Sequence, residues 1–286
     1  MLEPLVRFWW RLKFAFARAY GRMAKADPGP RLCKLAFEAA QRRDYGQFLL
    51  AVDLAGGVSD WHPAWLAVAA LVYFDVGRVA DAEKQLATAL EKAPEDPDVL
   101  ACYGEFLQKK DLHGDSIQYL SKVAGMMPAN VRTWALLGHA YQISGSSAKA
   151  RECYLRAMEC QPGSQQLGHI YSGLGHVAAG MEDWTEAARC WREAAARVPR
   201  MEYVWYNLGD ALLQAGEYGG AVQALRKDLR IGPQEPNYTY YDLASAYYHL
   251  GDLHRAMIYC ERVLDLKPDA SDALELKREL QKACTK

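Results

Sequence analysis

The chain has 286 residues, 51% of them hydrophobic and 24% charged, as in ordinary globular proteins that bury a substantial core. Its formal net charge of −1 excludes the basic balance of a nucleic-acid-binding chain, and no run of 18 apolar residues predicts a transmembrane helix. Seven scattered cysteines contain no CxxC pair, which favours reduced core cysteines in a cytoplasmic protein over a zinc or dithiol site.

Residues 1–28 are predicted to form a basic amphipathic helix rich in aromatic side chains. The first 26 residues hold six basic side chains and one acid, so the charge of the chain is unevenly spread. On a helical wheel the apolar side chains gather on one side and the basic ones on the other. Three alternatives remain open for this helix. It binds the inner surface of a membrane, it binds a partner protein, or it packs on the first helical hairpin of its own chain. The candidate docking residues are Trp9, Trp10, Phe16, Arg7, Arg11 and Arg18.

Residues 29–62 carry two apolar stripes at helical spacing. Leu32 and Leu35 fall on the first stripe, and Phe48 and Val52 fall on the second. The pair Gly56–Gly57 follows and favours a chain break. This segment is predicted to be a helical hairpin.

Prolines recur at nearly constant intervals through the rest of the chain. Five successive spacings are 34, 34, 37, 34 and 35 residues. The prolines are Pro94, Pro128, Pro162, Pro199, Pro233 and Pro268. A fixed period of this length indicates a stack of supersecondary repeats, none of which could bury its apolar face alone.

The unit that ends at Pro162 shows the repeat pattern most clearly. Its large and small positions are Trp134, Leu137, Gly138, Tyr141, Ala150 and Tyr154. This pattern resembles the tetratricopeptide-repeat (TPR) family. The resemblance implies an all-α, right-handed TPR superhelix with six repeats over residues 63–268, a degenerate hairpin at 29–62 and a capping helix over 269–286.

Small residues inside each unit have predicted structural roles. Gly138, Gly175 and Gly209 are expected to let the two helices of a hairpin approach closely. A second set near the middle of each unit is expected to end the first helix in a left-handed conformation. These are Gly77, Gly145, Gly216 and Gly251. The one 37-residue interval predicts a three-residue insertion within residues 163–166.

No motif in the sequence predicts catalysis. The segment 173–178 matches GxGxxA, but it falls inside a predicted helix rather than between a strand and a helix. His169 and His176 share a helix face about 10 Å apart, which is too far for one metal ion to bind both. We therefore predict no catalytic residue, no cofactor and no metal.

The resemblance implies that the first helix of each repeat lines a concave groove, with positions 2, 5, 9 and 12 facing it. The groove residues are then His139, His169, His176, Tyr203, Tyr206, Asp210, Tyr238, Tyr241 and Tyr248. Tyrosine suits protein recognition because it is amphipathic and loses little entropy when fixed. We expect four of these tyrosines, at positions 2 and 5 of consecutive repeats, to form one aromatic wall. The alternative is that some of them pack between helices.

These features predict a non-catalytic scaffold or adaptor that binds a peptide or protein segment in the groove, without nucleic acid. Two alternatives remain open. One is a membrane-associated assembly factor anchored by residues 1–26, and the other is a substrate-presenting subunit of an enzyme complex. The predicted location is cytoplasmic, with a peripheral membrane position open. The sequence does not predict the oligomeric state.

Overall fold

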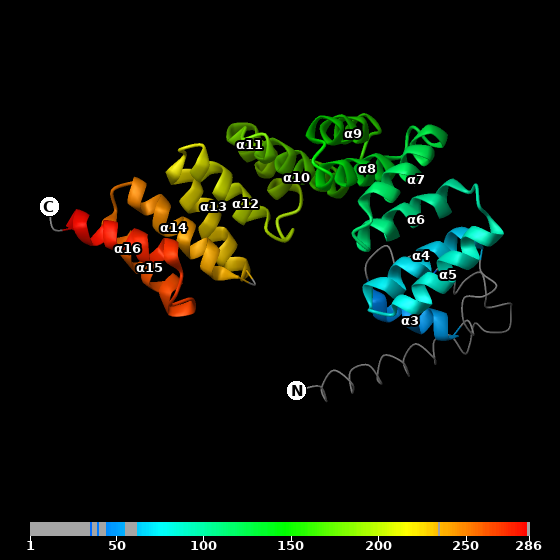
Figure 1. Cartoon of the computed structure of the whole chain (residues 1–286), viewed down its shortest axis with the longest axis horizontal. Coiled ribbons are helices and arrows are strands. Elements are labelled where there is room, and N and C mark those ends of the chain that lie inside the picture. Colours follow the sequence, from blue (N-terminus) through cyan, green and yellow to red (C-terminus); the bar gives the residue numbers. More distant parts are fainter. Residues whose placement is uncertain (1–34, 36–38, 40–43, 55–61, 234, 285–286) are drawn as a thin grey trace. The chain divides into compact units, whose positions relative to one another are not determined.

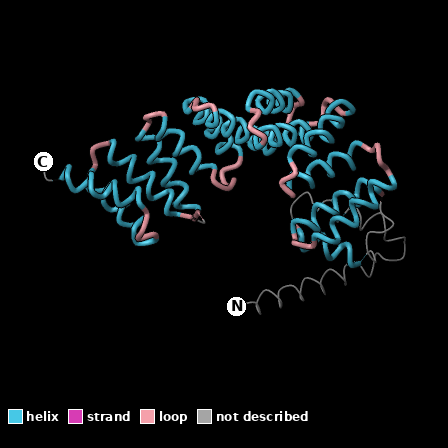
Figure 2. The backbone as a smooth tube through the Cα atoms, viewed as in Figure 1, coloured by secondary structure: helices cyan, strands magenta, loops and turns pink. Residues whose placement is uncertain are grey.

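Helices make up almost all of the chain that the computed structural model describes, which is residues 35, 39, 44–54, 62–233 and 235–284 (Figure 1). Those residues contain no β-strand, and short turns join consecutive helices (Figure 2). The chain divides into two compact units, Met1–Met127 (unit 1) and Pro128–Lys286 (unit 2). The all-α prediction is confirmed.

Unit 1 contains two helical hairpins and a preceding helix among its described residues. Its helices are α3 (Tyr45–Leu54), α4 (Pro63–Asp75), α5 (Val79–Lys92), α6 (Pro97–Lys109) and α7 (His113–Met126). In α3, Phe48 and Val52 are buried in the same core as the α4 and α5 side chains. The second apolar stripe predicted for residues 29–62 therefore lies on a helix that packs against the first hairpin.

Unit 2 contains four hairpins and a last helix. Its helices are α8 (Val131–Ile143), α9 (Ser147–Glu159), α10 (Ser164–Gly180), α11 (Trp184–Arg197), α12 (Val204–Gln214), α13 (Tyr218–Ile231), α14 (Pro236–His249), α15 (Leu253–Leu266) and α16 (Ser271–Cys284). The inserted residues predicted at 163–166 lie at the start of α10. That helix has 17 residues, against 13 in α8, so the insertion extends the helix by about one turn.

The helix ends follow from local sequence. Asp96, Asn130, Asp183 and Asp252 each accept hydrogen bonds from free backbone amides in the first turn of the following helix. The four glycines predicted to end the first helices all have φ between 76° and 81°. In the α6–α7 and α10–α11 loops, Asp111 and Glu182 hold the same left-handed conformation at φ 60° and 59°. The turn geometry is therefore a property of the repeat, whether or not glycine is present.

The glycines predicted to let two helices approach closely lie where the two helices of a hairpin touch. A Cβ atom added to Gly209 would lie 2.5 Å from Leu225 Cγ, and one on Gly175 would lie 2.8 Å from the Trp191 ring. At Gly138 the nearest atom, in the Tyr154 ring, would be 3.0 Å away. These distances confirm the predicted close approach. Gly173, which the repeat pattern did not single out, is tighter still, at 2.3 Å from Tyr154.

The same hydrogen bond recurs at the start of two first helices of unit 2. Trp134 Nε1 donates to the carbonyl oxygen of Pro128, and Trp205 Nε1 donates to that of Pro199, both at 2.8 Å. In each case a tryptophan satisfies a carbonyl of the loop that precedes its own helix, six residues earlier in the chain. The repeat prolines themselves lie two or three residues beyond the ends of their helices, as predicted.

The last helix, α16, covers the end of the core formed by the preceding repeats. Ala273, Leu276 and Leu280 are buried in the core that also contains α14 and α15 side chains. Leu274, in contrast, is 36% exposed. The opposite face carries charged side chains that remain in solvent.

Candidate protein-binding site

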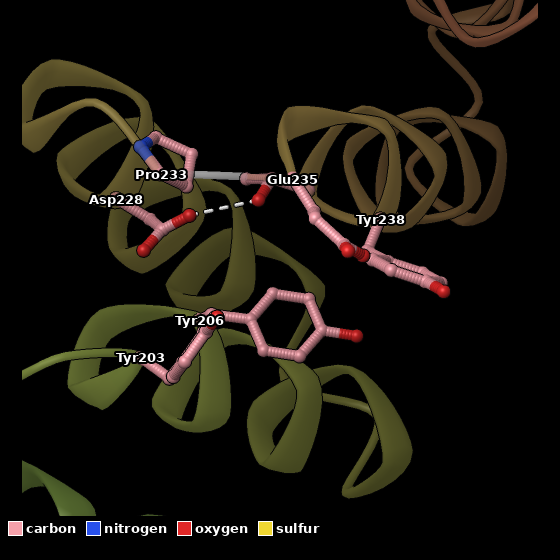
Figure 3. Close-up of a pocket in the computed structure, with 7 residues that line it drawn as sticks. Tyr203, Tyr206, Asp228, Pro233, Glu235 and Tyr238 are labelled. Carbon is pink, nitrogen blue, oxygen red and sulfur yellow. Dashed lines mark hydrogen bonds between the residues drawn. The ribbon is translucent and has the colours of Figure 1, made fainter. Parts of the chain in front are cut away.

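A pocket of about 240 Å³ lies between α12 and α14 in unit 2. Three of the four tyrosines predicted to form an aromatic wall, Tyr203, Tyr206 and Tyr238, line it (Figure 3). Asp228 from the end of α13 lies along its other side, as do Pro233 and Glu235 from the loop before α14. The structure thus brings together aromatic side chains from two consecutive first helices and carboxylates from the chain that connects them.

Tyr203 reaches the pocket from a strained backbone position. It is the N-cap residue of α12, with φ 58° and ψ 3°, a left-handed conformation that is unfavourable for a bulky side chain. Its side chain makes no capping hydrogen bond, and the residue is 44% exposed. Strained residues of this kind cluster at functional sites in proteins, which draws attention to this turn.

Asp228 replaces the missing cap of α12. Its carboxylate is buried, accepts a 2.7 Å hydrogen bond from Thr239 Oγ1, and also accepts from the backbone amide of Tyr206 in the first turn of α12. Burial raises the pKa of Asp228, and these two hydrogen bonds oppose that effect. One carboxylate from α13 therefore ties the start of α12 to α14 and fixes the walls of the pocket.

A second pair of carboxylates lies at the phenol end of Tyr206. The Tyr206 hydroxyl donates a hydrogen bond to Asp242 of α14. Burial, together with the nearby charge of Asp210 on α12, raises the pKa of Asp242 from 3.8 to about 7. Asp242 Oδ2 is buried and has no hydrogen-bond partner among the described residues. Such an atom is costly unless a donor reaches it.

The remaining predicted tyrosines have a different environment. Tyr241 and Tyr248 are half-buried and pack against the core of the C-terminal repeats, as Tyr206 does along one side of its ring. Only Tyr203 and Tyr238 are largely exposed, at 44% and 51%. Two of the five predicted groove tyrosines are thus largely exposed, and the other three are half-buried. That these side chains line a binding groove stays a prediction.

The three predicted histidines are exposed on α8 and α10 and do not lie in this pocket. The His176 ring packs edge-on against Trp191, with ring centroids 5.2 Å apart. Partial desolvation, and secondarily the nearby charge of His139, lower the pKa of His176. Within the described ranges, no group of three or more histidine, cysteine, aspartate or glutamate side chains is placed to hold a metal ion.

The residues predicted to dock on a membrane or partner, Trp9, Trp10, Phe16, Arg7, Arg11 and Arg18, lie outside the described residues, and their role stays a prediction. None of the described helices is both long enough and apolar enough to span a membrane.

Sequence reasoning named Asp210 but missed the other carboxylates of the site, although one signal was available. Other repeats place a small or medium apolar residue at the buried position that Asp228 occupies in its own repeat. These equivalents are Val123, Ala157, Ala194 and Val263. A lone acid at a core position of a repeat indicates a local polar contact. Asp242 and Glu235 carried no comparable signal because their neighbours come from other helices.

Comparison with known proteins agrees with the helical-hairpin architecture. Two family models described as tetratricopeptide repeat match the chain, one at residues 68–130 and 173–236 and the other at 131–164 and 238–270. The chain belongs to the tetratricopeptide-repeat family, which is generally non-catalytic and works through protein–protein interactions.

One curated relative is tetratricopeptide repeat protein 37 of Xenopus laevis, 24% identical over 270 residues. The match covers 88% of this chain but only 16% of that relative's length. Among solved structures, pilF of Pseudomonas aeruginosa is similar at a TM-score of 0.67 and 18% identity, covering 77% of this chain and 99% of that one. YrrB, a TPR protein with an unusual peptide-binding site, is similar at 0.59 and 16%, covering 68% and 97%. These structural likenesses support the fold alone.

Proposed function

We propose that this protein is an interaction scaffold whose unit 2 binds an extended segment of a partner protein across α12 and α14. The observation that carries the proposal is the pocket, where two largely exposed tyrosines and one half-buried tyrosine face the same space. Aromatic side chains with apolar faces and hydroxyl groups are the residues most enriched at protein interfaces.

The site is built to hold its shape before a partner arrives. Asp228 joins α12, α13 and α14 through its bonds to Thr239 and the Tyr206 amide, so the pocket walls are fixed by buried contacts. A preformed site loses less conformational entropy on binding, which increases affinity.

Site-specific photo-crosslinking tests this function. A benzoylphenylalanine replacing Tyr238 should crosslink the partner in cells, and mass spectrometry of the product should map the contact to one segment of that partner. The matched control replaces Ile258, which is 38% exposed on the second helix α15. Equal crosslinking at both positions, or none at Tyr238, would show that the partner binds elsewhere.

A further inference from the structure

The charges around the pocket are nearly all of one sign. Asp228 and Glu235 line it, and Asp210 and Asp242 lie at the phenol end of Tyr206, whereas none of the lining residues is basic. One cation, Lys267, is engaged at the rim, where its Nζ lies 5.0 Å from the centroid of the Tyr238 ring. A partner segment that fits this potential carries positive charge.

Two acceptors at the site have no donor among the described residues. Asp242 is 8% exposed, and its Oδ2 is buried without a hydrogen bond. Glu235 is exposed, is the N-cap residue of α14, and makes no capping hydrogen bond with its side chain. The other acids are occupied, because Asp228 bonds Thr239, and Asp210 accepts from Gln214 Nε2 at 3.2 Å.

The form of the pocket favours a planar cation over a compact one. Two of its tyrosines are about half exposed, so the site is open and a ligand there stays partly hydrated. A lysine ammonium is strongly hydrated and would gain little from such a site. A guanidinium is weakly hydrated, stacks on aromatic faces and offers five donors to carboxylates.

We infer that the pocket takes the side chain of an arginine in the partner segment, an inference that rests on the proposed function. The aliphatic part of the arginine lies against the rings of Tyr206 and Tyr238, and the guanidinium pairs with the acids around the pocket. Glu235 is the accessible carboxylate among the residues that line the pocket, and the buried Asp242 adds to the negative potential behind Tyr206.

Short peptides test this inference on the full chain. The probe is Ac-Gly-Leu-Arg-Leu-Gly-NH2, titrated calorimetrically beside versions with lysine, trimethyl-lysine or citrulline at the centre. Citrulline keeps the planar shape and removes the charge. We expect arginine to bind about tenfold tighter than citrulline, with lysine between them, because a charged hydrogen bond is worth at least that factor. Affinity for the arginine peptide should also fall with added salt.

Variants locate the effect in the pocket. Glu235→Gln should weaken binding of the arginine peptide several-fold and leave binding of the citrulline peptide unchanged. Tyr238→Leu should also weaken binding of the arginine peptide, whereas Tyr238→Phe should preserve it. The matched control is Glu279→Gln, which removes an exposed carboxylate from α16 and should change nothing. Melting curves of all variants separate loss of binding from loss of fold.

Several results would overturn the inference. Equal affinity for arginine and citrulline, tighter binding of lysine or trimethyl-lysine, an unchanged Glu235→Gln variant or no peptide binding at all would each do so. A segment crosslinked at Tyr238 that contains no arginine would refute the inference and leave the proposed function intact. Failure of crosslinking at Tyr238 would remove both.

Discussion

Asp75 of unit 1 and Asp242 of unit 2 are both carboxylates on the first helix of a hairpin, but their surroundings differ. Asp75 accepts a 2.7 Å hydrogen bond from Tyr45 Oη of α3 and forms a 2.5 Å ion pair with Lys109 Nζ of α6. Asp242 has a tyrosine hydroxyl and a second acid, Asp210, beside it, and one of its oxygens has no partner in the described part of the chain.

This difference separates acids that hold the fold together from acids that are available to a ligand. Each bond of Asp75 joins it to a different helix, so it contributes to the packing of α3, α4 and α6. Burying Asp242 without a cation has a free-energy cost that the fold tolerates. A buried carboxylate without a cation is typical of binding and catalytic sites, and is less common among residues that only stabilise the fold.

The largest predicted effect is that Asp242→Asn stabilises the protein at neutral and alkaline pH. The pKa of Asp242 is raised in the folded state to about 7, so its stabilising contribution is full below about pH 4 and is lost as pH rises towards 7. Asparagine keeps the acceptor for Tyr206 and avoids that loss. The gain should therefore grow from pH 4 to 7 and reach the order of 2–4 kcal/mol at pH 8.

Denaturant unfolding of both proteins at pH 4.5, 6, 7 and 8 measures this dependence. Asp210 and Tyr206 face Asp242 from α12, and Tyr241 lies on its own helix, so Asp210→Asn is the control for coupling between the two acids. A constant difference between the proteins at all four pH values would contradict the assignment.

The hairpin contacts, in contrast, should respond alike in the two units. Added Cβ atoms would lie 2.7 Å from Leu120 Cγ at Gly104 in unit 1, and 2.5 Å from Leu225 Cγ at Gly209 in unit 2. Leucine at either position should destabilise the protein by about 1–3 kcal/mol because the contact would be overpacked.

Thermal unfolding measures this loss, and two glycines in open space serve as matched controls. Gly114 of α7 and Gly219 of α13 have no atom within 4 Å of an added Cβ. Alanine there should stabilise by up to about 0.5–1 kcal/mol. A similar response at the tight and open glycines would mean that the helices do not approach as the structure shows.

A smaller loss is expected when the bonds of Asp75 are removed. Asp75→Asn should destabilise the protein by about 1 kcal/mol, since the pair is partly exposed and solvent screens it. Chemical denaturation measures the change, and Tyr45→Phe removes only the hydroxyl as a control. Stabilisation by Asp75→Asn, as expected for Asp242→Asn, would abolish the contrast between the two acids.

The sequence predicted the repeats well because each repeat is defined by local features. Apolar spacing, the glycine at the turn and the proline past the second helix act within about 34 residues, and six copies reinforce one another. It also predicted one wall of four tyrosines, of which Tyr203, Tyr206 and Tyr238 line the pocket and Tyr241 does not. It could not predict the half-burial of Tyr206, or that Asp242 Oδ2 has no partner among the described residues, because both depend on packing between side chains of neighbouring repeats.

The smallest predicted effect concerns the α6–α7 and α10–α11 turns, the two hairpin turns in which a residue other than glycine holds a left-handed conformation. Glu182 in unit 2 has φ 59°, and Asp111 in unit 1 has φ 60°. Glycine adopts this conformation without a Cβ clash, although it also increases the entropy of the unfolded chain. We expect Glu182→Gly to stabilise by about 0.5–1 kcal/mol. Asp111→Gly should gain less, because Asp111 Oδ1 lies 3.8 Å from His113 Nε2 and that pairing would be lost.

Denaturation midpoints measure both changes, with Glu182→Ala as a control that keeps the strained backbone and should give no gain. If Glu182→Ala stabilised the protein as much as Glu182→Gly, the left-handed backbone would not be the source of the strain. The turn geometry that the two units share would then carry no free-energy cost.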